Sequence, residues 1–124
     1  MRYIKTEDAL KPNGHYAQAI EHHGFLFLSG ILPFSRQTGK YVDGTVEEQM
    51  TEILANLDSI LAAAGSCPQK VLKTTIYISN MEEWGRVNAL YAEHFREHTP
   101  ARSIVAVDKL HFGAHLEMEA IACI

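Results

Sequence analysis

Residues 45–79 read TVEEQMTEILANLDSILAAAGSCPQKVLKTTIYIS, and this stretch decides the fold class. Thr45 and Glu48 have the spacing of a capping box, in which a Thr N-cap and a Glu at the third helical position satisfy free backbone amides. Apolar residues then recur at intervals of four and three, which predicts one apolar helix stripe: Val46, Met50, Ile53, Leu57, Ile60 and Ala64. Gly65 is a typical helix stop, and residues 71–79, rich in β-branched residues, predict a strand.

The segments on either side extend this pattern. Asn80–Glu83 is a second cap signal, and it opens a helix that ends at Thr99-Pro100. One face of that helix is expected to carry Trp84, Val87, Tyr91 and Phe95. Further strands are predicted over residues 2–5, 16–21, 25–29, 103–107 and 116–124, with a loop over residues 33–44.

The resulting order is β-β-β-α-β-α-β-β, which predicts one α+β domain over residues 1–124. Two helices would cover one face of a mixed sheet of about six strands. The continuous apolar run Phe25–Ser29 favours a strand buried on both faces. A monomer would leave the second sheet face exposed, so we expect a homo-oligomer that covers it.

Composition excludes several classes of protein. With 47% hydrophobic and 21% charged residues, the 124-residue chain has ample apolar material for a core. Its net charge is −4 and its 11 Lys and Arg are scattered, which disfavours a nucleic-acid partner. No membrane-spanning run or secretory signal is present, and two cysteines make no disulfide framework. We therefore expect a cytoplasmic protein.

Arg102 is the strongest candidate for chemistry. It lies between Pro100-Ala101 and the apolar strand that begins at Ser103. The planar guanidinium suits bidentate binding of a carboxylate. The alternative is an Arg that pairs with an internal Glu or points into solvent.

Two acidic residues form the next candidate. Alternation places Glu117 and Glu119 on one strand face and Leu116, Met118 and Ala120 on the other. A carboxyl group there could transfer protons or hold water, or the strand face could simply be solvated. Tyr16, which follows a turn, could close a pocket.

Metal and nucleophile chemistry have little support. His94 and His98 are four residues apart on a helix and His22-His23 are adjacent, but there is no HExxH motif, so we interpret the histidines as surface residues. Cys67 has no cue for activation. No phosphate-binding glycine loop and no GxSxG motif occur. No metal or organic cofactor is expected.

Motifs along nearly the whole chain resemble the reactive intermediate deaminases, the Rid or YjgF-like family. In chain order the motifs are Gly14–Ala19, Phe27–Pro33, Gln49–Gly65, Val71–Thr75, Val87–Phe95, Pro100–Ser103 and Glu117–Ala122. The last two of these motifs are the most specific. The resemblance implies a chorismate-mutase-like fold and a homotrimer with three ligand clefts between subunits. It also implies hydrolysis of 2-aminoacrylate-type enamines and 2-imino acids to 2-oxo acids and ammonia.

The resemblance also implies roles for individual residues. Arg102 would bind the substrate carboxylate, and Glu117 would orient water or relay protons. The other residues expected to line the cleft are Tyr16, Ser29, Gly30, Ile31, Asn88 and Phe112.

Several positions depart from the family pattern near this cleft. His15 replaces the usual Pro and Ile31 the usual Gln, and Leu110–Ala114 replaces Leu-Pro-Lys-Gly-Ala. His111 and Phe112 would suit a larger or aromatic-derived imino or enamine acid.

Two other functions remain open at this point. The first is a trimeric 2-oxo-acid-binding or regulatory protein without turnover, which Arg102 would serve equally well. The second is an endoribonuclease or translation inhibitor, against which the acidic balance argues.

Overall fold

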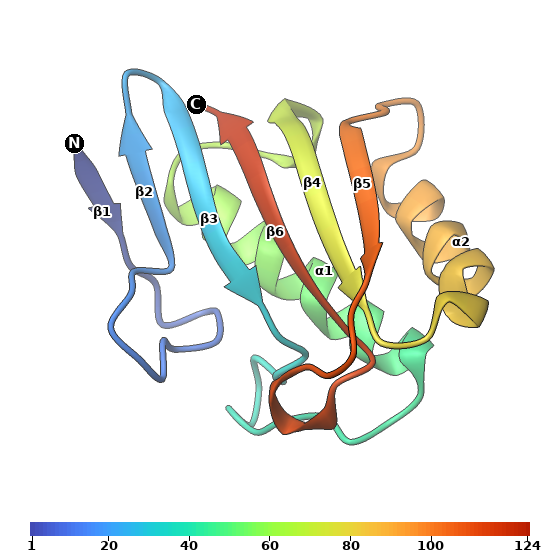
Figure 1. Cartoon of the computed structure of the whole chain (residues 1–124). Coiled ribbons are helices and arrows are strands. Elements are labelled where there is room, and N and C mark those ends of the chain that lie inside the picture. Colours follow the sequence, from blue (N-terminus) through green and yellow to red (C-terminus); the bar gives the residue numbers. More distant parts are fainter.

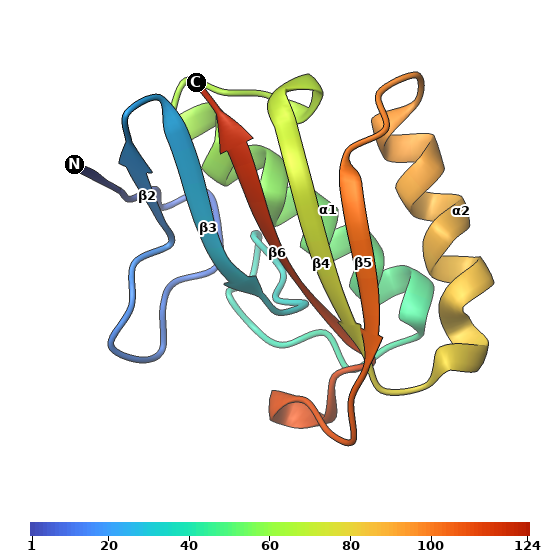
Figure 2. The ribbon, with the colours of Figure 1, turned by 45° about the horizontal axis from the view of Figure 1, so that its top comes forward.

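Helices α1 (Val46–Ala63) and α2 (Trp84–Phe95) lie on one face of a six-stranded sheet in the computed structural model, which describes residues 1–124 (Figures 1 and 2). The strands are β1 (Arg2–Ile4), β2 (Ala19–His22), β3 (Phe25–Ile31), β4 (Val71–Ile78), β5 (Ala101–Ala106) and β6 (Leu116–Cys123). The predicted order of elements and the α+β class are confirmed.

The strand order in the sheet is β1-β2-β3-β6-β4-β5. All neighbours are antiparallel except β4 and β5, which are parallel. A parallel pair needs a crossover connection, and α2 supplies it. The last strand, β6, therefore lies near the centre of a mixed sheet, and β5 forms one edge beside α2 (Figure 1).

The apolar stripe of α1 packs on the sheet as predicted. All six stripe residues are buried in one cluster with the inward-facing residues of the strands. The helix begins with the predicted capping box, in which Thr45 Oγ1 accepts a hydrogen bond from the Glu48 amide at 3.2 Å. Gly65, at φ +81°, provides the left-handed residue that ends it.

Two buried amides on α1 fix the loops around it. Asn56 accepts from the Leu10 amide and donates to the Phe34 carbonyl, both at 2.7 Å. Gln49 donates to the Tyr41 hydroxyl and the Val42 carbonyl, and its Oε1 accepts from the His115 amide. The inner side of α1 is therefore not only apolar, because its two amide side chains form hydrogen bonds to the loop over residues 32–44 and to the residue before β6.

Replacing Asn56 with alanine should lower the free energy of unfolding by about 3 kcal/mol, because it leaves a partly buried amide and a partly buried carbonyl without partners. Urea unfolding at a fixed protein concentration measures the effect. Glu93→Ala, on the exposed side of α2, is the control and should change stability by less than about 0.5 kcal/mol. Equal stability of the two variants would contradict the role assigned to Asn56.

The structure corrects two expectations about α2. The helix ends at Phe95 rather than at Thr99-Pro100, because Arg96 adopts φ +55° and breaks the helical path. Val87, Tyr91 and Phe95 are buried as predicted, but Trp84 is 41% exposed. It lies at the first residue of the helix, outside the core cluster.

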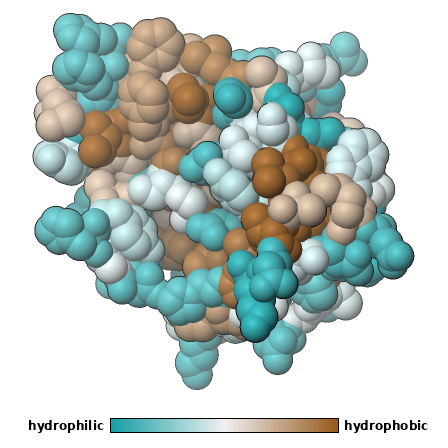
Figure 3. All heavy atoms as spheres, viewed as in Figure 1, coloured by the Kyte–Doolittle hydropathy of each residue, from teal (hydrophilic) through white to brown (hydrophobic).

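The expectation that β3 is buried on both faces is wrong for the single chain. Phe25 and Phe27 are 48% and 46% exposed on the face that no helix covers. Figure 3 views this face and shows hydrophobic side chains gathered over β2 and β3. Neither helix has both the length and the apolar character needed to cross a lipid bilayer.

Candidate functional site

Arg102 lies on β5, at the edge of the sheet, and its side chain points toward α2. Strand alternation places Arg102 and Ile104 on the helix-covered face, and Ile104 packs against the core there. The guanidinium Nη1 donates a hydrogen bond to Asn88 Oδ1 on α2 at 2.9 Å. The Pro100-Ala101-Arg102-Ser103 motif therefore delivers the guanidinium to the boundary between β5 and α2.

Two aromatic rings flank the guanidinium. The carbon Cζ lies 4.6 Å from the centre of the Tyr91 ring and 5.6 Å from that of Trp84. Both distances fall within the range of cation–π attraction. Burial raises the pKa of the Tyr91 phenol, while its hydrogen bond to Thr74 and the charge of Arg102 act in the opposite direction, and the net result is a raised pKa. Arg102 is thus held in position without an acidic partner.

The remaining donors of Arg102 are free to bind a ligand. None of the ion pairs of the chain involves this residue, and Asn88 is its one hydrogen-bond partner. A guanidinium has five N–H donors, so an edge remains available to a carboxylate. The side chain lines a surface hollow of about 320 Å³ together with Asn88, Tyr91 and Pro100. The internal ion pair considered as the alternative for Arg102 is absent.

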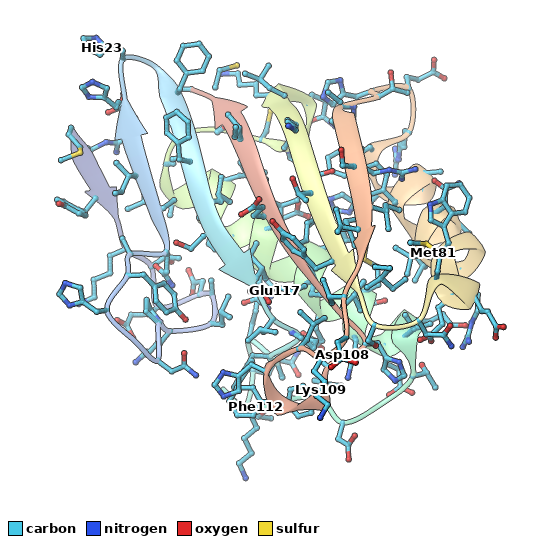
Figure 4. The ribbon with its side chains drawn as sticks, viewed as in Figure 1. His23, Met81, Asp108, Lys109, Phe112 and Glu117 are labelled. Atoms are coloured by element: carbon cyan, nitrogen blue, oxygen red, sulfur yellow. The ribbon has the colours of Figure 1, made fainter.

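Glu117 lies on the opposite face of the sheet, near the start of β6 (Figure 4). Leu116, Met118 and Ala120 are buried under the helices, so the alternation predicted for this strand is confirmed. Burial raises the pKa of the Glu117 carboxyl, the charge of Glu119 raises it further, and His111 partly offsets both. A carboxyl group with a raised pKa is better suited to exchange protons near neutral pH.

Glu119, by contrast, has a hydrogen-bond partner within the chain. It shares the face of Glu117, but its Oε1 accepts a hydrogen bond from the Tyr77 hydroxyl at 2.9 Å. The Glu117 carboxyl, in contrast, has no hydrogen-bond partner within the chain. Of the two carboxylates, Glu117 is therefore the one available to a substrate or a water.

Gly30 makes room for Glu117. A Cβ on Gly30 would overlap the Glu117 Oε1 atom and lie 3.0 Å from its Cδ. The register of β3 against β6 shifts between Leu28 and Ile31, so Gly30 occupies an irregular part of the pair. A side chain at residue 30 would have to displace the carboxylate.

Most of the other expected site residues lie near this end of β3, but one of them turns its side chain into the core. Tyr16, Ser29, Gly30 and Ile31 line one small hollow beside β3. The Tyr16 hydroxyl donates to Asn13 Oδ1 and the Ser29 hydroxyl to the Ala17 carbonyl. The Ile31 side chain is only 1% exposed and belongs to the core, so it points away from Glu117. Only its backbone is available to a ligand.

Phe112 lies on the loop before β6, at the same end of the sheet as Glu117 (Figure 4). Its ring is 47% exposed and stacks between neighbours rather than entering the core. The structure therefore places Tyr16, Ser29, Gly30, Phe112 and Glu117 around one end of β3 and β6.

Within one chain, Arg102 and Glu117 do not share a cleft. Arg102 pairs with Thr74 and Thr74 with Ala120, three residues from Glu117. Two strand spacings of about 4.8 Å and three residues of about 3.3 Å put their α-carbons roughly 14 Å apart. Their side chains also point to opposite faces of the sheet.

Comparisons with known proteins identify the family of this chain. The family model described as Endoribonuclease L-PSP matches residues 6–124. A RutC family protein of Pyrococcus horikoshii is 42% identical over 96% of this chain and 94% of its own. Reactive Intermediate Deaminase A of Arabidopsis thaliana is 40% identical over 96% of this chain and 64% of its own, longer chain. The chain belongs to the Rid/YjgF-like family.

Solved structures of similar proteins superpose closely on this fold. The Rid family protein YyfA of Yersinia pestis has a TM-score of 0.96 at 40% identity, covering 99% of this chain and 98% of its own. TdcF of E. coli, solved with bound serine, has a TM-score of 0.94 at 32% identity, covering 100% and 99%. The family resemblance and the fold expected from the sequence are therefore both confirmed.

Sequence reasoning missed that the Trp84 and Tyr91 rings flank the Arg102 guanidinium. Both were assigned to an apolar helix face, whereas the structure places their rings against Arg102. A signal was present, because Trp84, Asn88 and Tyr91 are spaced four and three residues apart on α2 and so share one face. If Asn88 is a candidate site residue, then Trp84 and Tyr91, which share its helix face, are candidate site residues as well.

The raised pKa of Glu117 predicts a pH-dependent effect on stability. The folded chain binds the Glu117 proton more tightly than the unfolded chain, in which the pKa of this carboxyl lies near 4.5. Ionisation of Glu117 therefore lowers the stability of the folded chain as the pH rises through the folded-state pKa. Glu117→Gln should therefore be more stable than the parent at pH 7, by no more than about 1 kcal/mol for a partly exposed group. The gain should vanish below about pH 4.

Urea unfolding at both pH values measures this difference. Glu119→Gln is the control, and it should show no such gain because its parent carboxylate has a hydrogen-bond donor in Tyr77. A parent protein more stable than Glu117→Gln at pH 7 would contradict the prediction.

Proposed function

We propose that this protein is a hydrolytic deaminase that converts 2-imino acids and their enamine tautomers to 2-oxo acids and ammonia. One observation carries the proposal: the Arg102 guanidinium is fixed by Asn88 and two rings, yet it has no acidic partner of its own. An Arg held in this way is suited to bidentate recognition of a substrate carboxylate.

The reaction needs little beyond orientation and proton transfer. Arg102 would fix the carboxylate and so hold the adjacent C=N carbon beside a water. As the water oxygen bonds to the carbon of the protonated imine, Glu117 takes a proton from the water and a neutral carbinolamine forms. Glu117 then gives that proton to the carbinolamine nitrogen, and the C–N bond breaks as the C=O bond forms. The hydroxyl proton released in this step passes through Glu117 to the leaving ammonia, which restores the carboxylate. Neither step needs a metal or an organic cofactor.

The complete site would lie between two copies of the chain. Arg102 and Glu117 point to opposite sheet faces, so one small substrate can meet both only if a neighbour supplies one of them. The helix-free face carries half-exposed Phe25 and Phe27, and covering it with other copies would bury them. We therefore propose a homotrimer with one cleft at each subunit boundary. Sizing of the native protein tests this assembly.

Two relatives support the choice of substrate class. The Arabidopsis thaliana relative is named as a reactive intermediate deaminase, and the E. coli TdcF structure holds serine, an amino acid with a free carboxylate. The bound serine also favours a second candidate function, a carboxylate-binding protein without turnover. The endoribonuclease description of the family has less support here, because the chain has net charge −4 and no basic run.

The deciding experiment generates 2-imino acids in place with an amino-acid oxidase and catalase, and follows their loss with and without the protein. We expect the protein to accelerate 2-oxo acid formation above the uncatalysed rate. Glu117→Gln separates the two candidates, since it should remove turnover but spare binding of a 2-oxo acid. No acceleration with any imino acid, together with tight 2-oxo acid binding, would favour the binding protein.

A further inference from the structure

We propose that a stack of aromatic rings beside Glu117 binds the substrate side chain, and that the preferred substrates are 2-imino acids with aromatic side chains. The aromatic stack consists of Tyr41, Phe112 and His111, with Phe34 edge-on against it. This inference rests on the proposed deaminase function and names the substrate class of the same site.

The rings are held in a common orientation. Phe112 lies nearly parallel to His111, with ring centres 4.0 Å apart and planes 18° apart. It also stacks on Tyr41 at 5.4 Å and 22°, while Phe34 meets it edge-on at 5.2 Å. Offset stacking and edge contacts are the preferred geometries of aromatic pairs. The half-exposed Phe112 ring and its neighbours are therefore already oriented before a ligand binds.

The backbone at Phe112 is unfavourable for a bulky residue. Its φ of +66° lies in the left-handed region, which costs free energy for any side chain other than glycine and is least costly for asparagine or aspartate. Even so, the ring is 47% exposed, so the unusual backbone does not serve to bury it in the core. A strained residue with a half-exposed ring is a candidate for a functional position.

The stack is anchored to α1. The buried Gln49 side chain donates to the Tyr41 hydroxyl at 2.9 Å and accepts from the His115 amide at 2.8 Å. One side chain thus ties together the loop that carries Tyr41 and the segment between Phe112 and Glu117. Ligand binding would not have to order these rings, which favours affinity.

The aromatic stack adjoins the carboxylate that would handle the proton. His111 is close enough to Glu117 to lower its pKa, and His111 stacks directly on Phe112. Figure 4 shows Phe112 and Glu117 at the same end of the sheet. A side chain on the reacting carbon would project from Glu117 toward these rings. A methyl group gains little from such a surface, whereas a phenyl ring can stack on it.

The test compares two imino acids, made by an amino-acid oxidase from phenylalanine and from alanine. We expect the parent protein to prefer the phenylalanine-derived imino acid at least tenfold in kcat/KM. Phe112→Asn should reduce that preference at least tenfold, because it removes the ring but suits the left-handed backbone. Phe112→Tyr, which keeps a ring, should retain most of the preference.

A matched control exists at the far end of the sheet. His23 also carries a ring at positive φ, +52°, and it lies in the β2–β3 turn far from Glu117 (Figure 4). His23→Asn makes the same kind of replacement and should leave the preference unchanged. An equal loss in His23→Asn would show that the effect is not local to the aromatic stack.

Binding measurements keep the inference testable if no imino acid is turned over. Phenylpyruvate should then bind at least tenfold more tightly than pyruvate, and Phe112→Asn should remove most of that difference. Absence of catalysis with this binding pattern would overturn the deaminase proposal alone. An unchanged preference in Phe112→Asn, or a change in oligomeric state without a change in preference, would overturn the role of the aromatic stack.

Discussion

Replacing Arg102 with alanine should reduce kcat/KM for imine hydrolysis at least 100-fold while the protein stays folded and assembled. The guanidinium is held by Asn88 at the β5–α2 boundary, where it can bind a carboxylate through charge-assisted hydrogen bonds in a hollow that Arg96 also lines. Each hydrogen bond to a charged group is worth about 1.5–3 kcal/mol, so two of them account for a loss of this size. Structural damage should be small, because Arg102 has no internal ion pair to break.

Arg102→Lys tests the geometry separately from the charge. An ammonium group cannot reproduce the planar fork held between Tyr91 and Trp84, so we expect at least a tenfold loss. Arg36→Ala, which removes a cation bonded only to the Ser59 hydroxyl, is the control and should keep full activity. Steady-state kinetics with sizing of each variant measures these effects. Full activity in Arg102→Ala would refute the assignment of the carboxylate anchor.

Gly30→Ala should lower kcat at least tenfold without unfolding the chain. The added Cβ would overlap the Glu117 carboxylate, and the flexible end of that side chain can move aside. Gly30 is not among the residues with positive φ, so the backbone accepts alanine. The loss should appear in kcat more than in binding of a 2-oxo acid, because the displaced group handles protons and Arg102 keeps the carboxylate.

A double variant shows whether Gly30 acts through Glu117. If it does, adding Gly30→Ala to Glu117→Gln should cost little further activity, since the two changes remove the same function. Fully additive losses would mean that residue 30 contacts the substrate directly. Gly85→Ala is the matched control: it lies in α2 with open space around it, and it should leave activity unchanged and stabilise the helix by up to about 1 kcal/mol.

Much of the fold could be predicted from the sequence because its signals are local. The capping box, the apolar stripe of α1 and the alternation of β6 each depend on residues close together in the chain. Trp84 shows where such reasoning fails. Its spacing matches the apolar face of α2, yet it lies at the end of the helix beside a cation, and no periodic pattern distinguishes these environments.

Sequence motifs could predict which residues belong to the candidate site, but they could not predict which of these residues lie close together in space. Arg102, Asn88 and Glu117 were each nominated from their motifs, and the structure puts the first two in contact. It separates both from Glu117 by the thickness of the sheet. Likewise Ile31 stands next to Gly30 in the chain, but its side chain enters the core while Gly30 faces Glu117.

The sequence by itself determined the order of elements, the buried face of α1, the alternation of β6 and the choice of Arg102 and Glu117 as candidates. Each of these follows from residue type and spacing within a single segment. Only the tertiary structure decided that Gly30 makes room for Glu117, that Tyr91 and Trp84 flank Arg102, and that Tyr41 and Phe112 stack together. These contacts join segments far apart in the chain, so they depend on strand order and register, which no local pattern encodes.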